Sequence, residues 1–447
     1  MRVEQQYIDI FRNYHEQLCN HSSSLLNEKR ENAVLDFEKN GFPSTSDEDY
    51  RYSDLAAAFA PDYGLNINRL HIPSRPMDVF KCDVPNLSTN LFFMVNDQIL
   101  ETEQSKGKLP EGVFAGSLNK FAELYPEIAE KHYASLADTD KDAIAAINTF
   151  LVQDGYVLYL PKGVVVEKPI QLVTLLRADV DFMTNRRILI IAEDRSEAKI
   201  LVCDHAVDSV KFLATQVVEI IAGKGVHLDY YELEETSDNT SRFSTLYLSQ
   251  DAESNVMVNG ITLHNGYSRN NYRVTLQGEY AETHLCGMAI SDKKQHVDTY
   301  SMIDHAVPNC TSNELFKYVL NDEATGAFSG RILVQKGAQK TAAFQTNRNL
   351  CATKSARMWS KPQLEIYADD VKCSHGMTTG QLDDKALFYM RSRGIPEKEA
   401  RLLLMFAFTS DVIENVRLEA LRDRLKMLVE MRFRGELAKC GGCAVCK

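Results

Sequence analysis

The sequence predicts a mainly β protein in which a long β-rich core lies between two helical regions. Short β-rich runs bounded by Gly, Asp and Asn extend from Gly155 to about Ile366, helical periodicity marks both flanks, and 447 residues are too many for one small domain. Because the β-rich segment has almost no helical periodicity, a doubly wound α/β sheet is excluded and a sandwich, a barrel or a β-solenoid remains. The length favours the solenoid, since each coil adds its own share of core.

The first region, residues 1–150, is predicted to be mainly helical. Ile8, Phe11, Tyr14 and Leu18 recur every three or four positions, which indicates an amphipathic N-terminal helix. A second short helical pattern spans Asp142–Phe150 after a punctuated stretch that begins at Gly41.

The core is predicted over residues 151–370, a helical domain over 371–436, and a Cys-rich tail over 437–447. In the helical domain Pro396 is expected in the first turn of a predicted helix, a position where proline is tolerated. The predicted strands are Tyr156–Leu160, Gly163–Val166, Ile170–Leu175, Arg187–Ile191, Gln216–Ile221, Arg273–Leu276, Arg331–Val334 and Gln363–Tyr367.

Composition and charge predict a cytoplasmic protein. The formal net charge of -12 disfavours attraction to nucleic acid or anionic lipid, so neither is expected as a partner. The segment Met1–Tyr7 lacks the apolar core of a signal peptide, and aliphatic runs such as Ile188–Ala192 are too short to span a membrane. Ten Cys in a chain of this length fit reduced thiols.

A narrow leucine stripe marks the last predicted helix. Leu418, Leu421, Leu425 and Leu428 follow one another at spacings of three, four and three residues on a helix that is otherwise charged. Such a stripe requires a partner surface, which is either the chain's own solenoid or preceding helix, or another chain.

Cys373 and His375 are candidates for metal chemistry. In an extended strand they lie two residues apart, point to the same face, and are separated by about 6 to 7 Å along the strand. A thiolate and an imidazole at that spacing can meet one soft metal or cluster. The alternative is a buried structural cysteine beside a structural histidine.

The terminal Cys440, Cys443 and Cys446 form two overlapping Cys-x-x-Cys steps. Three thiolates could chelate zinc or iron, but the tail contains no fourth ligand to close a tetrahedral site. The alternative is a frayed chain end with reactive thiols.

Two enzymatic functions can be compared with the residue patterns. Asp298, Asp304 and Asp322 are candidate acids for a β-helix polysaccharide lyase or hydrolase, although aspartates at such spacings also arise as turn caps. Gly326–Arg331 lacks the Lys-Ser/Thr pair of a phosphate-binding loop, so the chain is not expected to hydrolyse ATP.

Five longer runs of the sequence are distinctive: His296–Thr299, Asp304–Asn313, Gly337–Thr341, Pro362–Gly376 and Leu387–Ile395. Together these runs resemble the SufD family of iron-sulfur cluster assembly proteins. Weaker matches at Gly41–Pro43, Asp47–Tyr52 and Tyr156–Gly163 extend the resemblance over most of the chain.

The resemblance implies a right-handed parallel β-helix between helical terminal regions. It also implies a non-catalytic scaffold subunit in a complex with the paralogue SufB and the ATPase SufC, on which a transient iron-sulfur cluster is built and passed to apo-proteins. His375 is then a cluster-assembly residue near the SufB interface, with Cys373 as its neighbouring thiol. The C-terminal helices, including Leu418 to Leu428, are the expected SufC dock.

The sequence departs from the family pattern at two places. Met377–Thr379 replaces the more usual Ala-Thr-Val, which leaves His375 untouched, and the tail from Cys440 to Cys446 is not part of the pattern. A metal or redox module that acts through this tail therefore stays open beside the scaffold. Cluster type, sulfur donor, flavin binding and a homodimer of the isolated chain stay open as well.

Overall fold

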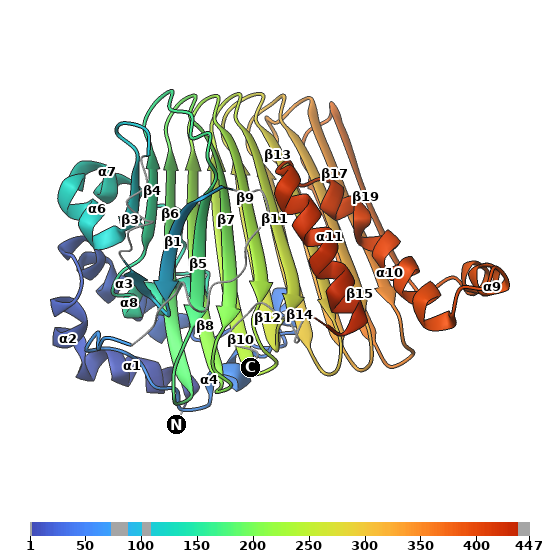
Figure 1. Ribbon diagram of the computed structural model, residues 1–447. Helices are drawn as coiled ribbons and strands as arrows, with labels where there is room; N and C mark the ends of the chain where they lie inside the picture. Colours follow the sequence, from blue (N-terminus) through green and yellow to red (C-terminus); the bar gives the residue numbers. More distant parts are fainter. Residues whose placement is uncertain (1, 73–87, 101–108, 437–447) are drawn as a thin grey trace.

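The computed structural model describes residues 2–72, 88–100 and 109–436. The described strands form a long, flattened solenoid with two facing sheets, and helices cover its N-terminal end and part of each outer face (Figure 1). From β4 (Tyr156–Leu160) onward the chain alternates between the two sheets, and strands of one sheet run parallel to one another. This arrangement confirms the predicted parallel β-helix between helical regions.

Among the described residues, ten strands form the first sheet and nine form the second. The ten-stranded sheet contains β1 (Asn90–Val95), β2 (Gln98–Leu100), β5 (Ile170–Leu176), β7 (Glu197–Ala206), β9 (His227–Glu235), β11 (Asn255–His264), β13 (Glu282–Ser291), β15 (Thr311–Leu320), β17 (Thr341–Cys351) and β19 (Val371–Gly380). The nine-stranded sheet contains β3 (Phe114–Ser117), β4 (Tyr156–Leu160), β6 (Phe182–Ala192), β8 (Phe212–Ala222), β10 (Thr240–Gln250), β12 (Tyr267–Leu276), β14 (His296–His305), β16 (Thr325–Val334) and β18 (Arg357–Ile366).

The register of the strands places similar side chains next to one another in the interior. Alternate residues point inward, and the parallel pairing stacks like on like: Ile188 of β6 is aligned with Val218 of β8, which is aligned with Leu246 of β10. The sharp turns that follow β6, β8 and β10 each contain a left-handed residue, which is Arg195, Gly225 and Glu253 in turn. The regular stacking explains why short β-rich runs with polar punctuation predict this fold.

The interior is not uniformly apolar, because four charged side chains meet between the sheets. Asp204 accepts hydrogen bonds from Arg186 at 2.5 Å and from Arg242 at 2.8 Å, and Arg242 also pairs with Glu232. Burial alone would raise the pKa of Asp204, but the two arginines outweigh it and hold this pKa below its usual value.

The N-terminal helices cover the outer face of the nine-stranded sheet. Helix α8 (Ala143–Leu151) packs on β6, β8 and β10, and Asp142 caps its first turn while accepting hydrogen bonds from Thr245 and Tyr247. The other elements of this region are α1 (Val3–Asn13), α2 (His15–Asn20), α3 (Ser24–Asn40), the 3-10 turn η1 (Glu48–Tyr50), α4 (Leu55–Phe59), α6 (Leu118–Leu124) and α7 (Pro126–His132).

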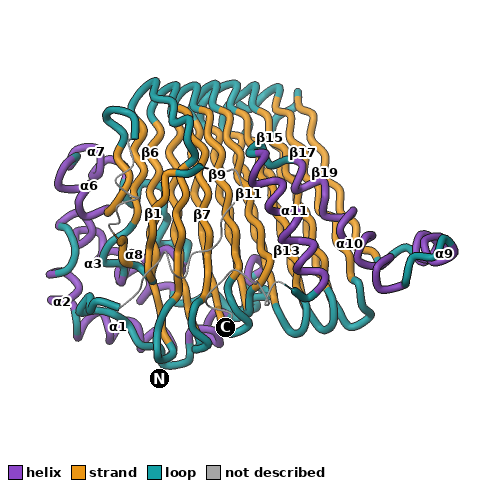
Figure 2. Tube along the Cα trace, in the orientation of Figure 1, coloured by secondary structure: helices purple, strands orange, loops and turns teal. Residues whose placement is uncertain are grey.

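Three helices follow the last strand: α9 (Asp384–Ser392), α10 (Glu397–Glu414) and α11 (Glu419–Arg434). Helices α10 and α11 lie on the outer face of the ten-stranded sheet, whereas α9 extends past the end of the solenoid (Figures 1 and 2). Polar contacts join these helices to the sheet: Lys317 on β15 donates to the Phe408 carbonyl of α10 at 2.8 Å, and Arg417, between α10 and α11, donates to Asp229 of β9 at 3.0 Å.

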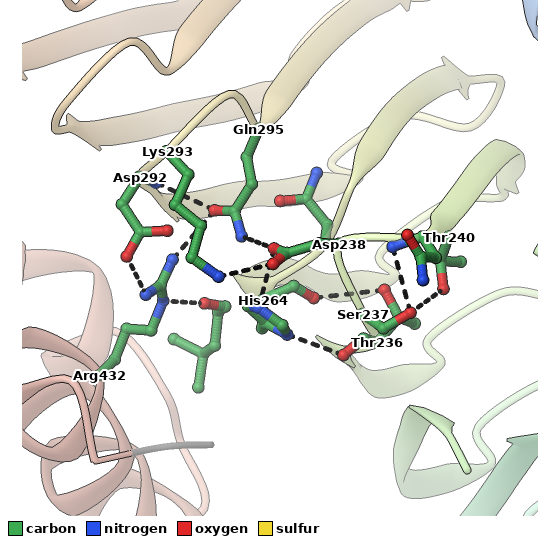
Figure 3. A network of polar contacts seen from close by, with 12 residues as sticks. Thr236, Ser237, Asp238, Thr240, His264, Asp292, Lys293, Gln295 and Arg432 are labelled. Carbon is green, nitrogen blue, oxygen red and sulfur yellow. Dashed lines mark hydrogen bonds and ion pairs between the residues drawn. The ribbon is translucent and has the colours of Figure 1, made fainter. Parts of the chain in front are cut away.

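Arg432, in the last turn of α11, makes a third polar contact with the solenoid and belongs to a larger polar network. Its guanidinium pairs with Asp292 at 2.5 Å and donates to Gln295, whose amide in turn donates to Asp238 at 2.8 Å (Figure 3). The network ties the end of α11 to loops of the solenoid.

Some predicted elements differ from the observed ones. The predicted N-terminal helix breaks at Tyr14, between α1 and α2, and Gly163–Val166 forms only an isolated bridge at Val165. Three short strands, β1 to β3, lie in the region expected to be mainly helical. The last strand, β19, extends the sheet to Gly380, past residue 370 where the core was predicted to end.

Candidate functional site

The C-terminal end of the solenoid is open. β19 ends the strand order of the ten-stranded sheet and β18 ends that of the nine-stranded sheet, so no strand among the described residues covers either outer edge. Most residues of β19 are exposed. Two adjacent unpaired edges present backbone donors and acceptors to another strand.

Cys373 and His375 lie on β19 and face the inner side of the sheet. Cys373 is aligned with Ala343 and His375 with Gln345, and both β17 partners are buried in the interior. Aligned residues of parallel strands share a face, so the predicted common face of the two side chains is confirmed. His375 is exposed, whereas Cys373 is half-buried against a small apolar cluster, and this burial raises the pKa of its thiol.

A polar interior lies directly behind His375. Gln345 donates through Nε2 to Oε2 of Glu314 on β15 at 2.7 Å, and Ser301 of β14 also donates to the Glu314 carboxylate. Glu314 is only 3% exposed, and its burial raises the pKa of the carboxyl to about 7.

More polar side chains continue this interior toward the open end. Asn349 donates to Asn347 at 2.6 Å and to Thr379 of β19 at 3.2 Å, and Ser360 of β18 donates to Asn347 at 2.7 Å. Sequence reasoning missed these residues. The inward positions of β17 carry polar residues at every second position. In the sequence such an alternation indicates a face exposed to solvent, so it does not point to a polar interior.

The candidate acids are not brought together as a glycosidase pair would require. Asp298 is buried and paired with Arg269 at 2.5 Å, and Asp322 lies in a turn with a positive φ of 49°. Asp298 and Asp304 lie six residues apart on one strand, β14, which separates them by about 20 Å. Paired catalytic carboxylates lie within about 10 Å of each other, so Asp298 and Asp304 do not form such a pair.

The leucine stripe packs on the chain's own solenoid. Leu421, Leu425 and Leu428 are 1–2% exposed and contact the outer face of the ten-stranded sheet, and Leu418 packs beside them at the N-cap of α11. Of the two alternatives for this stripe, the structure shows the intramolecular one. These side chains are covered, so a contact of α11 with an ATPase would have to use the opposite face of the helix.

The terminal Cys440, Cys443 and Cys446 lie outside the described residues. Within the described ranges no group of three or more His, Cys, Asp or Glu side chains is arranged to hold a metal ion. Cys373 and His375 are two side chains, fewer than a complete tetrahedral iron site requires.

The N-terminal segment around Tyr50 to Ser53 contacts the outer face of the nine-stranded sheet, and these contacts give two of the sequence runs named above a structural role. Ser53 donates to Asp298, and the ring of Tyr50 lies 4.5 Å from the Arg269 guanidinium that pairs with the same carboxylate. Tyr52 stacks on Trp359 of β18 at 4.6 Å between ring centroids. The runs Asp47–Tyr52 and His296–Thr299 thus meet on the outer face of the nine-stranded sheet and have a structural role.

Two protein-family models match nearly the whole chain. A model described as "SufBD protein N-terminal region" matches residues 1–172, and one described as "SUF system FeS cluster assembly, SufBD core domain" matches residues 175–408. No helix in the described part of the chain is long and apolar enough to cross a membrane.

Curated relatives agree with these matches. The chain is 27% identical to an iron-sulfur cluster assembly SufBD family protein of Synechocystis over 92% of this chain and 91% of that protein. It is 35% identical to the iron-sulfur cluster assembly protein SufD of Escherichia coli over 47% of this chain and 49% of that protein, and 25% identical to SufD of Bacillus subtilis over 79% and 81%. The chain therefore belongs to the SufBD family of iron-sulfur cluster assembly proteins.

Proposed function

We propose that the chain is a non-catalytic scaffold subunit of a cytoplasmic SufBCD-type complex that assembles a transient iron-sulfur cluster and passes it to apo-proteins. The observation that carries this proposal is the pair Cys373 and His375, which faces inward at an open strand edge. The pair offers a thiol and an imidazole to iron, and the free edge leaves room for the chain that completes the ligand set. The cluster is cargo here, not a resident cofactor.

The partner at this edge is, in this proposal, a SufB-like paralogue. A second solenoid that ends in free strands can continue both sheets through backbone hydrogen bonds, which are the same for any sequence. Side chains at the inward positions of the joined strands then meet His375. A shared site of this kind explains why two ligands suffice on this chain.

The partner at the helical end is a SufC-like ATPase. Helix α9 protrudes from the solenoid and exposes Phe388 and Tyr389, which are 73% and 59% exposed, and Leu403 of α10 is 40% exposed (Figure 1). Large exposed apolar side chains on a projecting helix are typical of interaction sites. They replace the buried leucine stripe as the dock in this proposal.

His375→Ala is expected to reduce the iron and sulfide recovered per complex by tenfold or more and to leave the complex assembled. The side chain is exposed on an edge strand, so its loss removes a ligand without opening a cavity. Iron and acid-labile sulfide in the purified complex measure this effect. Ser374→Ala is the matched control, since Ser374 is an exposed neighbour on the opposite face of β19.

Two results would contradict the role of His375. Normal iron and sulfide in the His375→Ala complex would exclude it as a ligand, and a dissociated complex would make it a structural residue. Cys373→Ser made in parallel should have the smaller effect. A larger one would transfer the main role to the cysteine.

The double change Phe388→Ser and Tyr389→Ser is expected to weaken binding of the ATPase partner by at least tenfold, because anchors of this size contribute about 2 kcal/mol or more when buried in an interface. Titration calorimetry or a quantitative pull-down with the purified ATPase measures the change. Leu124→Ser is the control: Leu124 is 58% exposed at the end of α6, in the N-terminal region. Equal affinity of the double variant and the control variant would place the dock elsewhere.

A further inference from the structure

Glu314, Gln345 and His375 occupy one ladder position on three neighbouring strands. Glu314 of β15 is aligned with Gln345 of β17, which is aligned with His375 of β19. Neighbouring parallel strands lie about 4.8 Å apart, so side chains of aligned residues stack within reach of one another. The three residues form a row from the buried interior to the open edge.

The buried end of this row is a carboxyl group without a counter-charge. Within the described part of the chain no lysine, arginine or histidine pairs with Glu314, whose hydrogen-bond donors are Ser301 and Gln345. Burying an unpaired carboxylate is costly, and natural interiors rarely retain one without a role. An ionisable core group placed two strands from the open edge therefore requires an explanation.

Gln345, in the middle of the row, has a side-chain amide whose orientation is fixed by its neighbours. Nε2 of Gln345 is committed to Glu314, so Oε1 remains as an acceptor, and this oxygen is buried without a hydrogen-bond partner. Gly330 of β16 lies beside the amide, where a Cβ atom would come within 2.3 Å of Nε2. The glycine makes room for this side chain in this orientation.

The exposed end of the row, His375, is the ladder neighbour of the residue that carries the free oxygen. The same strand pair already joins aligned side chains, since Asn349 of β17 donates to Thr379 of β19 at 3.2 Å. Rotation of the His375 side chain can bring a ring N–H toward Oε1 of Gln345 in the same manner. Once one ring nitrogen carries the proton, the other keeps its lone pair free for a metal.

We propose that Glu314, through the side-chain amide of Gln345, fixes the tautomer and orientation of His375 and so prepares its outer ring nitrogen to bind iron. Both are positioning residues, because neither is placed to touch the metal. The ionised carboxylate holds Nε2 of Gln345, the amide oxygen accepts from the imidazole, and the charge deep in the solenoid thereby selects which nitrogen is offered at the edge. The value of this arrangement for cluster assembly rests on the function proposed above, whereas the arrangement itself does not.

The tautomer of His375 is measured directly by 15N NMR of the full-length chain labelled with 15N-histidine, with His375 assigned by comparison with His375→Ala. At pH 8.5 the Glu314 carboxyl is ionised, and the wild-type chain should show one tautomer of His375 in at least tenfold excess. Gln345→Leu and Glu314→Gln should both bring the two tautomers to comparable populations. Iron retention by the complexes of these variants should weaken by about 10-fold to 100-fold, the usual effect of losing a partner that orients a ligand.

The control is Glu234→Gln. Glu234 is also buried in the interior, with Ser268 and Thr262 as its donors, but it lies on β9, far from the open edge. Its replacement should leave the His375 tautomer unchanged. A His375 tautomer ratio that is the same in wild type, Glu314→Gln and Gln345→Leu would overturn the proposal.

Two further outcomes distinguish failure of this positioning proposal from failure of the proposed function. If Glu314→Gln fails to fold, Gln345→Leu alone decides, since it removes the link and keeps the carboxyl. If the tautomer shifts as expected while His375→Ala retains its cluster, the row of side chains is supported and the proposed function is wrong.

Discussion

Replacing Arg242 by methionine is expected to lower the free energy of unfolding by about 3 to 5 kcal/mol, the usual cost of removing one member of a buried ion pair. Arg242 is 2% exposed and contacts Asp204, Glu232 and Asn270, so its loss leaves Glu232 in the interior without its paired cation and Asp204 with Arg186 alone. Urea unfolding followed by circular dichroism measures the shift. Few single changes in this chain should cost as much.

The position of Arg242 explains the size of this effect. Its partners Asp204 and Glu232 lie on β7 and β9 of the ten-stranded sheet, whereas Arg242 itself lies on β10 of the other sheet. The ion pairs therefore connect the two sheets across the interior. Arg242→Lys should recover only part of the loss, because one ammonium cannot reproduce the separate contacts that a guanidinium makes.

Arg12→Met is the control for the loss of an arginine. Arg12 pairs with Glu31 and Glu38 on the surface, where its side chain is 42% exposed, and such pairs contribute about 1 kcal/mol or less. An unfolding midpoint of Arg242→Met equal to that of Arg12→Met would mean that water or neighbouring polar groups replace the lost partner.

Leu425→Asp is expected to detach α11 from the solenoid while the sheets stay folded. Leu425 is 1% exposed against the ten-stranded sheet, and burying a carboxylate there without a partner would cost about 3 to 5 kcal/mol or more. Cys203 and Cys286 lie in the same apolar cluster under the helices. Faster reaction of these two thiols with a thiol reagent, with an unchanged β signal in circular dichroism, measures the detachment.

Met427→Asp is the matched control, since Met427 lies two residues later on the same helix and is 39% exposed. It should leave both thiols protected. The ATPase partner separates the two interpretations of the leucine stripe. Loss of the partner together with thiol exposure follows from a detached helix, whereas loss with protected thiols would support direct contact by the leucines.

Alternation along the strands was the part of the fold most accessible from the sequence. The shared face of Cys373 and His375 follows from extended geometry alone, and the structure confirms it. Strand lengths were underestimated where charged residues point inward: Arg187–Ile191 was predicted, but β6 spans Phe182–Ala192 and includes the buried Arg186. A polar residue in a core position looks like the end of a strand when only the sequence is read.

The row from Glu314 to His375 could not be predicted from the sequence, because its residues meet only through the register. Gln345 follows Glu314 by 31 residues and His375 follows Gln345 by 30, so turn length varies from coil to coil. No fixed period identifies the aligned positions. The leucine stripe shows a related limit: an amphipathic pattern predicts a covered face but does not identify the covering surface.

The N-terminal segment that stacks Tyr52 on Trp359 spans four successive strands of the nine-stranded sheet and so limits the number of coils in the solenoid. Between residues 48 and 53 it contacts Arg269 on β12, Asp298 on β14, Arg331 on β16 and Trp359 on β18. Repeat proteins commonly gain or lose coils during evolution, yet one added coil here would move Trp359 by about 4.8 Å and break the stack. The number of coils, and with it the distance of the open edge from the N-terminal helices, is therefore tied to the length of this segment.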